Sequence, residues 1–493
     1  MHIMIGIRST NYHAPPPPSM IRISNQRMAR SKVTSTTRSI FIWFGLGIAS
    51  LILGVTVINR LSSDSLNILI PQQPLSDAPR PPLLITKRQR QPSAYLDGQP
   101  VYLVQDKPPI SHVQCLSENF LPNSWMYRSC RFENLCFDLQ TKTFVLHPSK
   151  AQQHLQSHLH NETFLSLFPK EMISGGQHSA WLKQGRSKWI PESRNASNST
   201  SYYALSDDVV WVSFYPWADC NHGHLLWDSF LPIYTLLEIF QLKDKTLFLT
   251  EMLNERSDCA PLMKQMAPMM GVQQDLKIKR ITDLELQGDT KGESHLVCAK
   301  HAANGMGWLT DHGLGKHGSR PRDFTSQQNV GRGPNLAGFR EYALRNLGIP
   351  TKMTKRPPTQ VTFSILSSKD PERRLDFHRQ IEHLQKTLPD VQINRVAMWN
   401  CTVREQVEIA TQSAIFISVG GGGTSSAFFL QQGAALILYG KEGQRYDWDL
   451  WNNYAHIRVH WLSTTHLDQD IDLLVDLIRV ELERIESSEN NIM

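Results

Sequence analysis

Acidic residues are absent from positions 1–39, and the following segment, 40–58, contains no charge of either sign. The uncharged segment is close to the roughly 20 apolar residues with which a helix spans a bilayer. Six Lys and Arg residues precede it, which predicts a cytosolic N-terminus and places the rest of the chain across the membrane. A cleaved signal peptide is disfavoured because its apolar core is usually about 7 to 15 residues long and its basic leader is short. The pattern predicts a single-pass type II membrane protein.

The chain beyond this segment lacks a net charge. Of its 51 Lys and Arg residues six lie in the leader, so 45 remain against 45 Asp and Glu. Proteins that bind nucleic acid usually present an excess of Lys and Arg to the phosphates. The balance argues against a nucleic-acid partner.

Zinc-type cysteine spacing is also missing. All seven cysteines follow the predicted span, where oxidation is permitted, and their odd number leaves at least one outside an internal pair. Four sequons fit a secretory address and are the predicted glycosylation sites: Asn161, Asn195, Asn198 and Asn400. No internal repeat is found.

The chain divides by composition and periodicity. Residues 1–39 form a basic cytosolic leader, 40–58 the transmembrane helix, and 59–100 a stem rich in Pro, Ser and Gln without strand or helix periodicity. Residues 101–350 are predicted to form an N-terminal α/β domain. Its strand at 209–217 is followed by a helix at 230–240, where Pro232 requires a place in the first turn.

Strands and helices alternate with short loops in residues 351–445, which predicts a parallel doubly wound sheet. Residues 446–493 are predicted to be a C-terminal helical segment. The overall fold class is therefore α/β.

Four consecutive glycines, Gly420–Gly423, separate the predicted strand 414–419 from the predicted helix 425–433. Ligands of such sheets bind at the carboxyl ends of the strands, and a helix N-terminus presents free amides to an anion. The glycines would let a diphosphate touch the backbone, with Thr424 and Ser425 adding hydroxyl donors. A glycine-packed corner between helix and sheet explains the same residues equally well. The loop is neither G-x-G-x-x-G nor a Walker loop.

His224 and Asp228 follow the strand at 209–217 and are four residues apart, on one face at the entry of a helix. A histidine oriented by a carboxylate is a usual general base. The alternative is a helix-capping segment beside a structural histidine. The residues alone favour this alternative.

Several of these segments, taken in their order and spacing, resemble the family 61 glycosyltransferases. The similar segments are the cysteine-containing 125–138, the N-x-x-H-x-x-x-D-like 221–228, 298–308, 339–349, 364–375 and 403–438. The resemblance implies two facing Rossmann-like domains of GT-B type, inversion at the anomeric carbon, and a UDP-sugar as co-substrate with no cofactor or metal. It covers roughly residues 115–439.

Carried onto this chain, the resemblance assigns donor binding to Gly420–Gly423 and the hydroxyls after them. It assigns phosphate neutralisation to Arg373 or Arg374, and the nucleotide wall to Glu405 and Gln406. His224 or Asp228 would be the catalytic base, and the choice between them stays open. The family's glycine loop begins with His where this chain has Gly420, and Ser367 or Ser368 stands where an Arg is expected.

Metal-dependent glycosyltransferases use a D-x-D after a central strand. The acidic triplets at 206–208, 447–449 and 468–470 do not follow such a strand and are predicted to be solvated surface. A G-x-S-x-G elbow, expected of a hydrolase of the α/β class, is absent.

The sequence therefore predicts a Golgi- or ER-anchored inverting glycosyltransferase with a luminal catalytic region. It would transfer GlcNAc or xylose from a UDP-sugar to a glycan or protein hydroxyl. The alternative is a catalytically silent, glycan-binding or chaperone-like membrane protein on the same fold.

Overall fold

The computed structural model describes residues 92–116, 129–149, 173–174, 188–189, 191–196, 201–216, 220–252, 260–272, 278–288, 294–305, 333–351, 359–366, 373–440 and 448–490. These residues belong to one compact unit, Arg88–Met493. The predicted leader, transmembrane helix and most of the stem lie outside the described residues. Within the described ranges, no helix combines the length and apolarity needed to cross a membrane.

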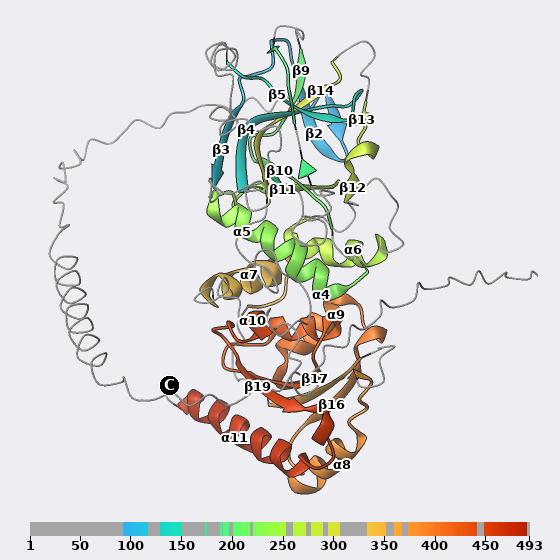
Figure 1. Ribbon diagram of the computed structural model, residues 1–493, viewed down its shortest axis with the longest axis vertical. Coiled ribbons are helices and arrows are strands. Elements are labelled where there is room, and N and C mark those ends of the chain that lie inside the picture. The colour runs from blue at the N-terminus through green and yellow to red at the C-terminus, as the bar shows by residue number, and fades with distance from the viewer. Residues whose placement is uncertain are drawn as a thin grey trace, which may run out of the picture. The chain divides into compact units, whose positions relative to one another are not determined.

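The first part of the unit is a twelve-stranded mixed sheet (Figure 1). Its strands are β1 (Ala94–Leu96), β2 (Gln99–Val104), β3 (His112–Leu116), β4 (Ser129–Asp138), β5 (Thr143–Leu146), β8 (Glu192–Ser193), β9 (Tyr202–Leu205), β10 (Val209–Phe214), β11 (Thr246–Glu251), β12 (Lys279–Arg280), β13 (Leu286–Gln287) and β14 (Leu296–Gly305). The run β12-β11-β10-β14-β9 is parallel. Strands β1 to β5 pair antiparallel with one another or with β9, β13 and β14, and β5 also pairs parallel with β8. This sheet is mixed and not purely parallel. A separate antiparallel pair joins β6 (Ile173–Ser174) and β7 (Lys188–Trp189).

The sheet begins earlier than predicted. β1 and β2 form a hairpin over residues 94–104. The prediction of an extended stem without strands is therefore wrong for residues 94–100. Asp97 and Gly98 occupy the two-residue turn, and both have positive φ, 46° and 78°. Asp-Gly with this geometry is a strong short-range hairpin signal, which the proline-rich surroundings obscured.

In the part of the chain that the structure describes, two disulfides each join a pair of antiparallel strands. Cys115 and Cys130 face each other across β3 and β4, and Cys136 and Cys298 across β4 and β14. Cys401 is a free thiol, as the odd cysteine number requires of at least one residue. The disulfides are typical of an extracellular or luminal location.

The second part is a five-stranded, all-parallel, Rossmann-like sheet of order β16-β15-β17-β18-β19. Its strands are β15 (Gln360–Ile365), β16 (Ile393–Ala397), β17 (Ser413–Val419), β18 (Ala435–Gly440) and β19 (Arg458–Ser463). The predicted alternation is confirmed up to β18. The sheet extends past residue 445, however, because β19 lies in the segment predicted to be only helical.

Helices cover both faces of the parallel sheet (Figure 1). Along β18, Ile437 and Tyr439 pack with α8 (His378–Thr387) and α11 (Ile471–Asn490), while Leu436 and Leu438 pack on the other side with α9 (Val403–Thr411). This alternation follows from the two-residue period of a strand buried on both faces.

The core beside α9 continues into helices that follow the mixed sheet. These are α5 (Leu231–Ile239), α6 (Ala260–Met266) and α7 (Gly333–Asn346). Trp227 meets the ring of Trp451 in the short α10 (Trp448–Trp451) at 5.1 Å, and Phe339 meets Phe428 at 5.4 Å. The segment after β10 is thereby packed against α10, after β18, and α7 is packed against the segment after β17.

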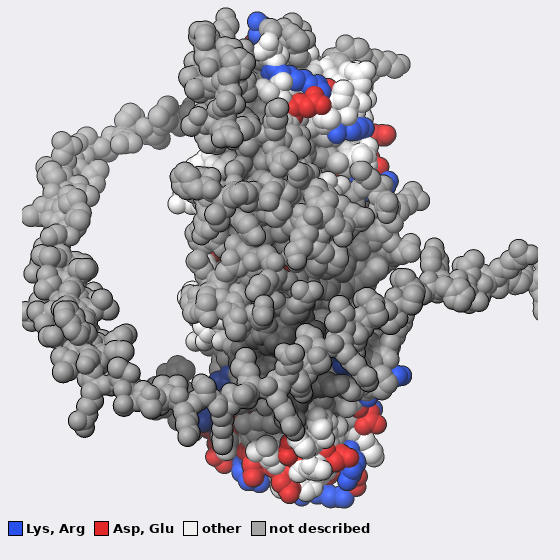
Figure 2. Space-filling model, viewed as in Figure 1, with Lys and Arg blue, Asp and Glu red and all other residues white. Residues whose placement is uncertain are grey.

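Charged side chains of both signs are mixed over the α8 and α11 end of the view in Figure 2. Arg379 pairs there with Asp468 at 2.5 Å, and Lys386 with Glu382 at 2.8 Å. The face drawn shows no extended basic stripe among the described residues.

Candidate functional site

The glycine loop lies at the topological switch point of the parallel sheet. The strand order reverses between β15 and β17, and β17 ends at Val419, directly before Gly420. In open α/β sheets this point, at the carboxyl ends of the strands, is where ligands bind. The predicted placement of Gly420–Gly423 at a carboxyl edge is confirmed.

The loop runs into a short 3-10 helix, η10 (Gly422–Phe429), where an α-helix over 425–433 was predicted. Gly421 has φ of +139°, which favours glycine. The amide of Thr424 makes the first turn bond, to the Gly421 carbonyl at 2.9 Å. The amides of Gly422 and Gly423 precede that bond, so the turn itself offers them no acceptor.

Each of these three glycines is in close contact with another segment. A Cβ on Gly421 would lie 1.5 Å from Nη2 of Arg373, and one on Gly423 would lie 2.7 Å from the Leu366 side chain. A Cβ on Gly422 would lie 2.2 Å from Oδ1 of Asn221. The lack of side chains is therefore needed for packing, and the Arg373 guanidinium lies directly against the loop. Arg374 is exposed, and it is not among the side chains that a Cβ on these glycines would meet.

Asn221 opens the helical segment that meets the loop. Its side chain caps α4 (His222–His224), because Oδ1 accepts a hydrogen bond from the amide of Gly223 at 2.9 Å. Gly223 packs against the backbone of Gly422. A larger residue at Gly223 would separate the two backbones, and one at Gly422 would displace the Asn221 side chain.

The helix continues from α4 through a π-helical stretch, η4 (Leu225–Phe230), into α5. Pro232 explains the irregularity, since it has no N–H and its ring clashes with the carbonyl of residue 228 in a regular helix. The helix thus starts well before the predicted residue 230. Wider turns of this kind are frequent at functional sites, and this one holds Asp228.

His222 connects the two segments. Its Nδ1 lies 2.5 Å from the hydroxyl of Ser425, which in turn donates to the Gly422 carbonyl at 2.7 Å. Burial lowers the pKa of His222 to about 4, so its ring is neutral and its Nδ1–H donates to Ser425. The proximity of the 221–228 segment to the glycine loop, 200 residues later, could not be read from local pattern.

His224 and Asp228 form a pair in which the carboxylate is buried and the imidazole is partly exposed. Nδ1 of His224 lies 2.6 Å from Oδ2 of Asp228, whose side chain is only 2% exposed while that of His224 is 21% exposed. The carboxylate therefore orients the ring from behind, and the imidazole is the member that solvent or a ligand can reach.

The remaining predicted donor residues have structural partners. Thr424 donates to the Val419 carbonyl at 2.5 Å, and Gln406 accepts from Ser426 at 2.8 Å while donating to the Met398 carbonyl. Gln406 thus ties η10 to the turn before α9. Glu405 is exposed and completes a capping box with Thr402; this hydrogen bonding lowers the pKa of Glu405.

Two of the predicted sequon asparagines are described. Asn195 and Asn400 are exposed, while Asn161 and Asn198 lie outside the described residues. The hydroxyl of Thr402, in the Asn400 sequon, is engaged in the helix cap.

The acidic triplets were predicted to be solvated surface, and three of their described residues are exposed. Asp207, Asp208 and Asp468 are exposed, and Asp207 pairs with Lys300 at 2.7 Å. In the described part of the chain, no three His, Cys, Asp or Glu side chains converge as a metal site would require.

Comparison with known proteins adds little. No protein family profile and no curated protein matches the chain. Among solved structures, the flavodiiron protein from Giardia intestinalis is similar over 39% of this chain and 45% of its own length, at 12% identity and a TM-score of 0.19. The chain spans less than half of that protein, and a likeness at this level carries no functional argument.

Proposed function

We propose that the protein is a type II membrane-anchored, inverting glycosyltransferase of GT-B type in the ER or Golgi. It transfers GlcNAc or xylose from a UDP-sugar to a hydroxyl of a glycan or protein. The observation that carries the proposal is the contact between the 221–228 segment and the glycine loop, made by His222 and Ser425 at 2.5 Å. Two segments selected independently from the sequence lie in contact at a topological switch point.

The glycine loop supplies the features needed to hold a leaving diphosphate. The Gly422 and Gly423 amides lie at the start of η10, and the Arg373 guanidinium lies against Gly421. Amide dipoles and a fixed cation stabilise the charge that develops on the diphosphate as the sugar leaves.

His224 is the proposed general base, and Asp228 is its positioning residue. With Nδ1–H held by the buried carboxylate, the other ring nitrogen is the proton acceptor. It removes the proton of the acceptor hydroxyl as that oxygen attacks the anomeric carbon from the face opposite UDP. The bond from the anomeric carbon to the diphosphate oxygen breaks, which inverts the configuration.

The close packing of Gly422 against Asn221 favours one alternative, a silent binding protein that keeps the loop only as a packing corner. Gly420, which stands where the resembling family has His, favours it as well. The two functions differ in turnover.

The test measures UDP release by the full-length protein in detergent with UDP-GlcNAc or UDP-xylose and a panel of hydroxyl acceptors. Asp228→Asn should lower turnover at least about 100-fold, because it loses a positioned base, with UDP affinity retained. Asp472→Asn is the matched control, since Asp472 pairs with His383 at 2.8 Å on the exposed surface. It should leave turnover unchanged. Acceptor-dependent UDP release by the Asp228→Asn variant at the normal rate would remove the pair from the chemistry.

A further inference from the structure

A concave feature lies on the mixed sheet, away from the glycine loop. It is a cleft of about 370 Å³, a size at the small end of ligand sites. Its wall includes Asp138, His147, Arg194, Asn195, Ser294 and Leu296.

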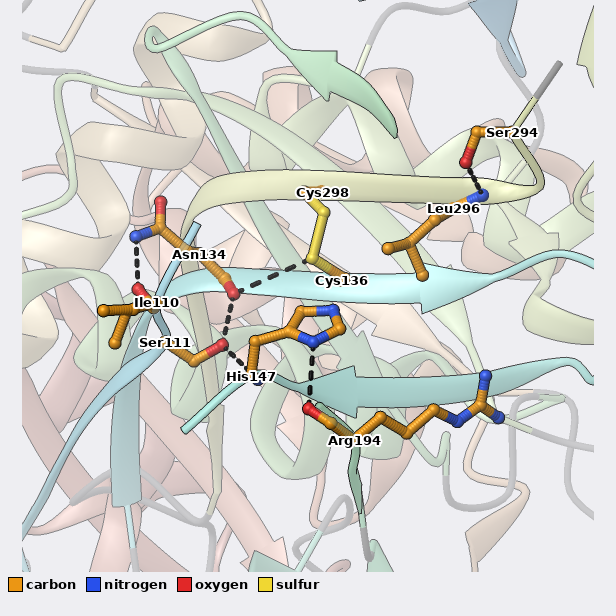
Figure 3. Close-up of a disulfide and its surroundings, with 9 residues drawn as sticks. All are labelled: Ile110, Ser111, Asn134, Cys136, His147, Arg194, Ser294, Leu296 and Cys298. Carbon is orange, nitrogen blue, oxygen red and sulfur yellow. Dashed lines mark hydrogen bonds between the residues drawn. A yellow bond between two sulfur atoms is a disulfide. The ribbon is translucent and has the colours of Figure 1, made fainter. Parts of the chain in front are cut away.

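His147 lines this cleft and is 3% exposed. Its Nδ1 lies 3.0 Å from the carbonyl of Arg194, which can only accept, so Nδ1 carries the proton. Burial lowers the pKa of His147 and keeps the ring neutral. Nε2 is therefore an acceptor, and among the described residues nothing donates to it. In Figure 3 this ring edge is turned away from Arg194, on the side of Leu296.

The ring is held rigidly. Ser111 donates to the Asn134 carbonyl at 2.8 Å and accepts from the His147 amide at 2.9 Å. The Cys136–Cys298 disulfide fixes the adjoining strands beside the ring (Figure 3). A buried hydrogen-bond acceptor without a donor costs about 1 to 3 kcal/mol. A rigidly held acceptor on the wall of a cleft therefore suits a ligand that donates a hydrogen bond.

The charges on the wall neutralise each other. Arg194 pairs with Asp138 and with Glu192, the latter at 2.6 Å, and also donates to Thr141 and Thr143 at 3.1 Å. Other described wall groups carry no charge: the Ser294 hydroxyl, the Asn195 and Gln140 amides, the neutral His147 ring, and the apolar Val145 and Leu296. Neutral hydrogen-bonding groups beside apolar carbon match the hydroxyls and C–H faces of a sugar better than a charged ligand.

We propose that this cleft binds a saccharide and that a sugar hydroxyl donates to Nε2 of His147. The proposal does not depend on transferase activity. The saccharide has two sources. Asn195 is an exposed sequon residue on the wall, so its own N-glycan can occupy the cleft, or the glycan of another molecule can do so.

The experiment uses the full-length protein produced in glycosylating cells, and a Ser197→Ala variant that removes only the Asn195 sequon. Binding of diacetylchitobiose, mannobiose, xylobiose and lactose is measured by ligand-observed NMR. If the protein's own glycan fills the cleft, only Ser197→Ala binds a probe. If the glycan comes from another molecule, both proteins bind. Failure of Ser197→Ala to bind any of the four overturns the proposal.

The site is assigned with two substitutions of His147 in the Ser197→Ala background. His147→Asn keeps a donor near the Nδ1 position and loses the Nε2 acceptor, so affinity should fall at least tenfold. His147→Gln keeps an acceptor near Nε2 and should bind more tightly than the Asn variant. Equal binding by all three overturns the assignment. If the variants do not fold, ¹⁵N NMR of the histidine rings in Ser197→Ala decides: the Nε2 signal of one neutral ring should shift with sugar, and unchanged ring signals refute the proposal.

Discussion

Removing the Ser425 hydroxyl should destabilise the protein by an amount set by the burial of His222. Ser425 is completely buried, and its oxygen is the acceptor for Nδ1 of His222 at 2.5 Å. In the Ser425→Ala protein this N–H loses its acceptor, and Nε2 of the same ring, itself an acceptor, has no donor among the described residues. Leaving a buried donor unsatisfied costs about 1 to 3 kcal/mol.

The expected shift of the melting temperature is small, because the compact unit is large. With an unfolding entropy of about 2.1 cal/mol/K per residue over roughly 400 residues, the cost corresponds to about 1 to 4 °C. A double-mutant cycle with His222→Phe isolates the pair. In the His222→Phe background Ser425→Ala should cost at least about 0.5 kcal/mol less than in the wild type.

The cycle is measured by urea unfolding at pH 7 and again toward pH 5. His222 has a folded pKa of about 4, below its ordinary value of 6.5, so the unfolded chain binds the extra proton between these values. Stability should therefore rise with pH from about 4 to 6.5, and less steeply in His222→Phe. Additive costs and an unchanged pH slope would refute the contact between the two segments.

Three further results are expected. Gly422→Ala should destabilise the protein more than Gly423→Ala in urea unfolding. The methyl at 422 meets the Asn221 side-chain oxygen that caps α4, at 2.2 Å, whereas the methyl at 423 meets the end of a flexible leucine at 2.7 Å; equal costs would contradict the packing. Arg373→Ala should weaken UDP binding about 10- to 100-fold by calorimetry, the value of a charge-assisted hydrogen bond, whereas the exposed Arg374→Ala should stay within about twofold. Burial raises the pKa of Glu481, but hydrogen bonds and the charges of its cationic partners outweigh this and lower it. Its contribution to stability is therefore complete above the ordinary carboxyl pKa and is lost as pH falls, and acid unfolding of Glu481→Gln should depend less on pH.

Local pattern predicted the parallel sheet because each strand–helix unit there is short and buried on both faces. The final strand escaped prediction, since β19 is only partly buried and its sequence carries His and Arg among apolar residues. The N-terminal sheet was less predictable. Its antiparallel strands pair across long separations, such as β4 with β14, and such pairing leaves no local periodicity.

The candidate site, too, was predictable only in part. The His224–Asp228 pair was predictable because its spacing is a helical one, and the glycine loop because it follows a strand. The contact of Asn221 and His222 with that loop was not, since it depends on how separate segments pack. The π-helical turn follows from Pro232 but needs the helix to continue upstream, which the sequence pattern did not show.

The most direct test of the central claim is a calorimetric titration of the full-length protein with UDP, in the presence of EDTA or of a divalent metal. A diphosphate held by the glycine-loop amides and Arg373 predicts saturable binding that EDTA does not change and that Gly421→Val abolishes. Absence of UDP binding under every condition, from a protein that melts cooperatively, would contradict the account and make the glycines a packing corner.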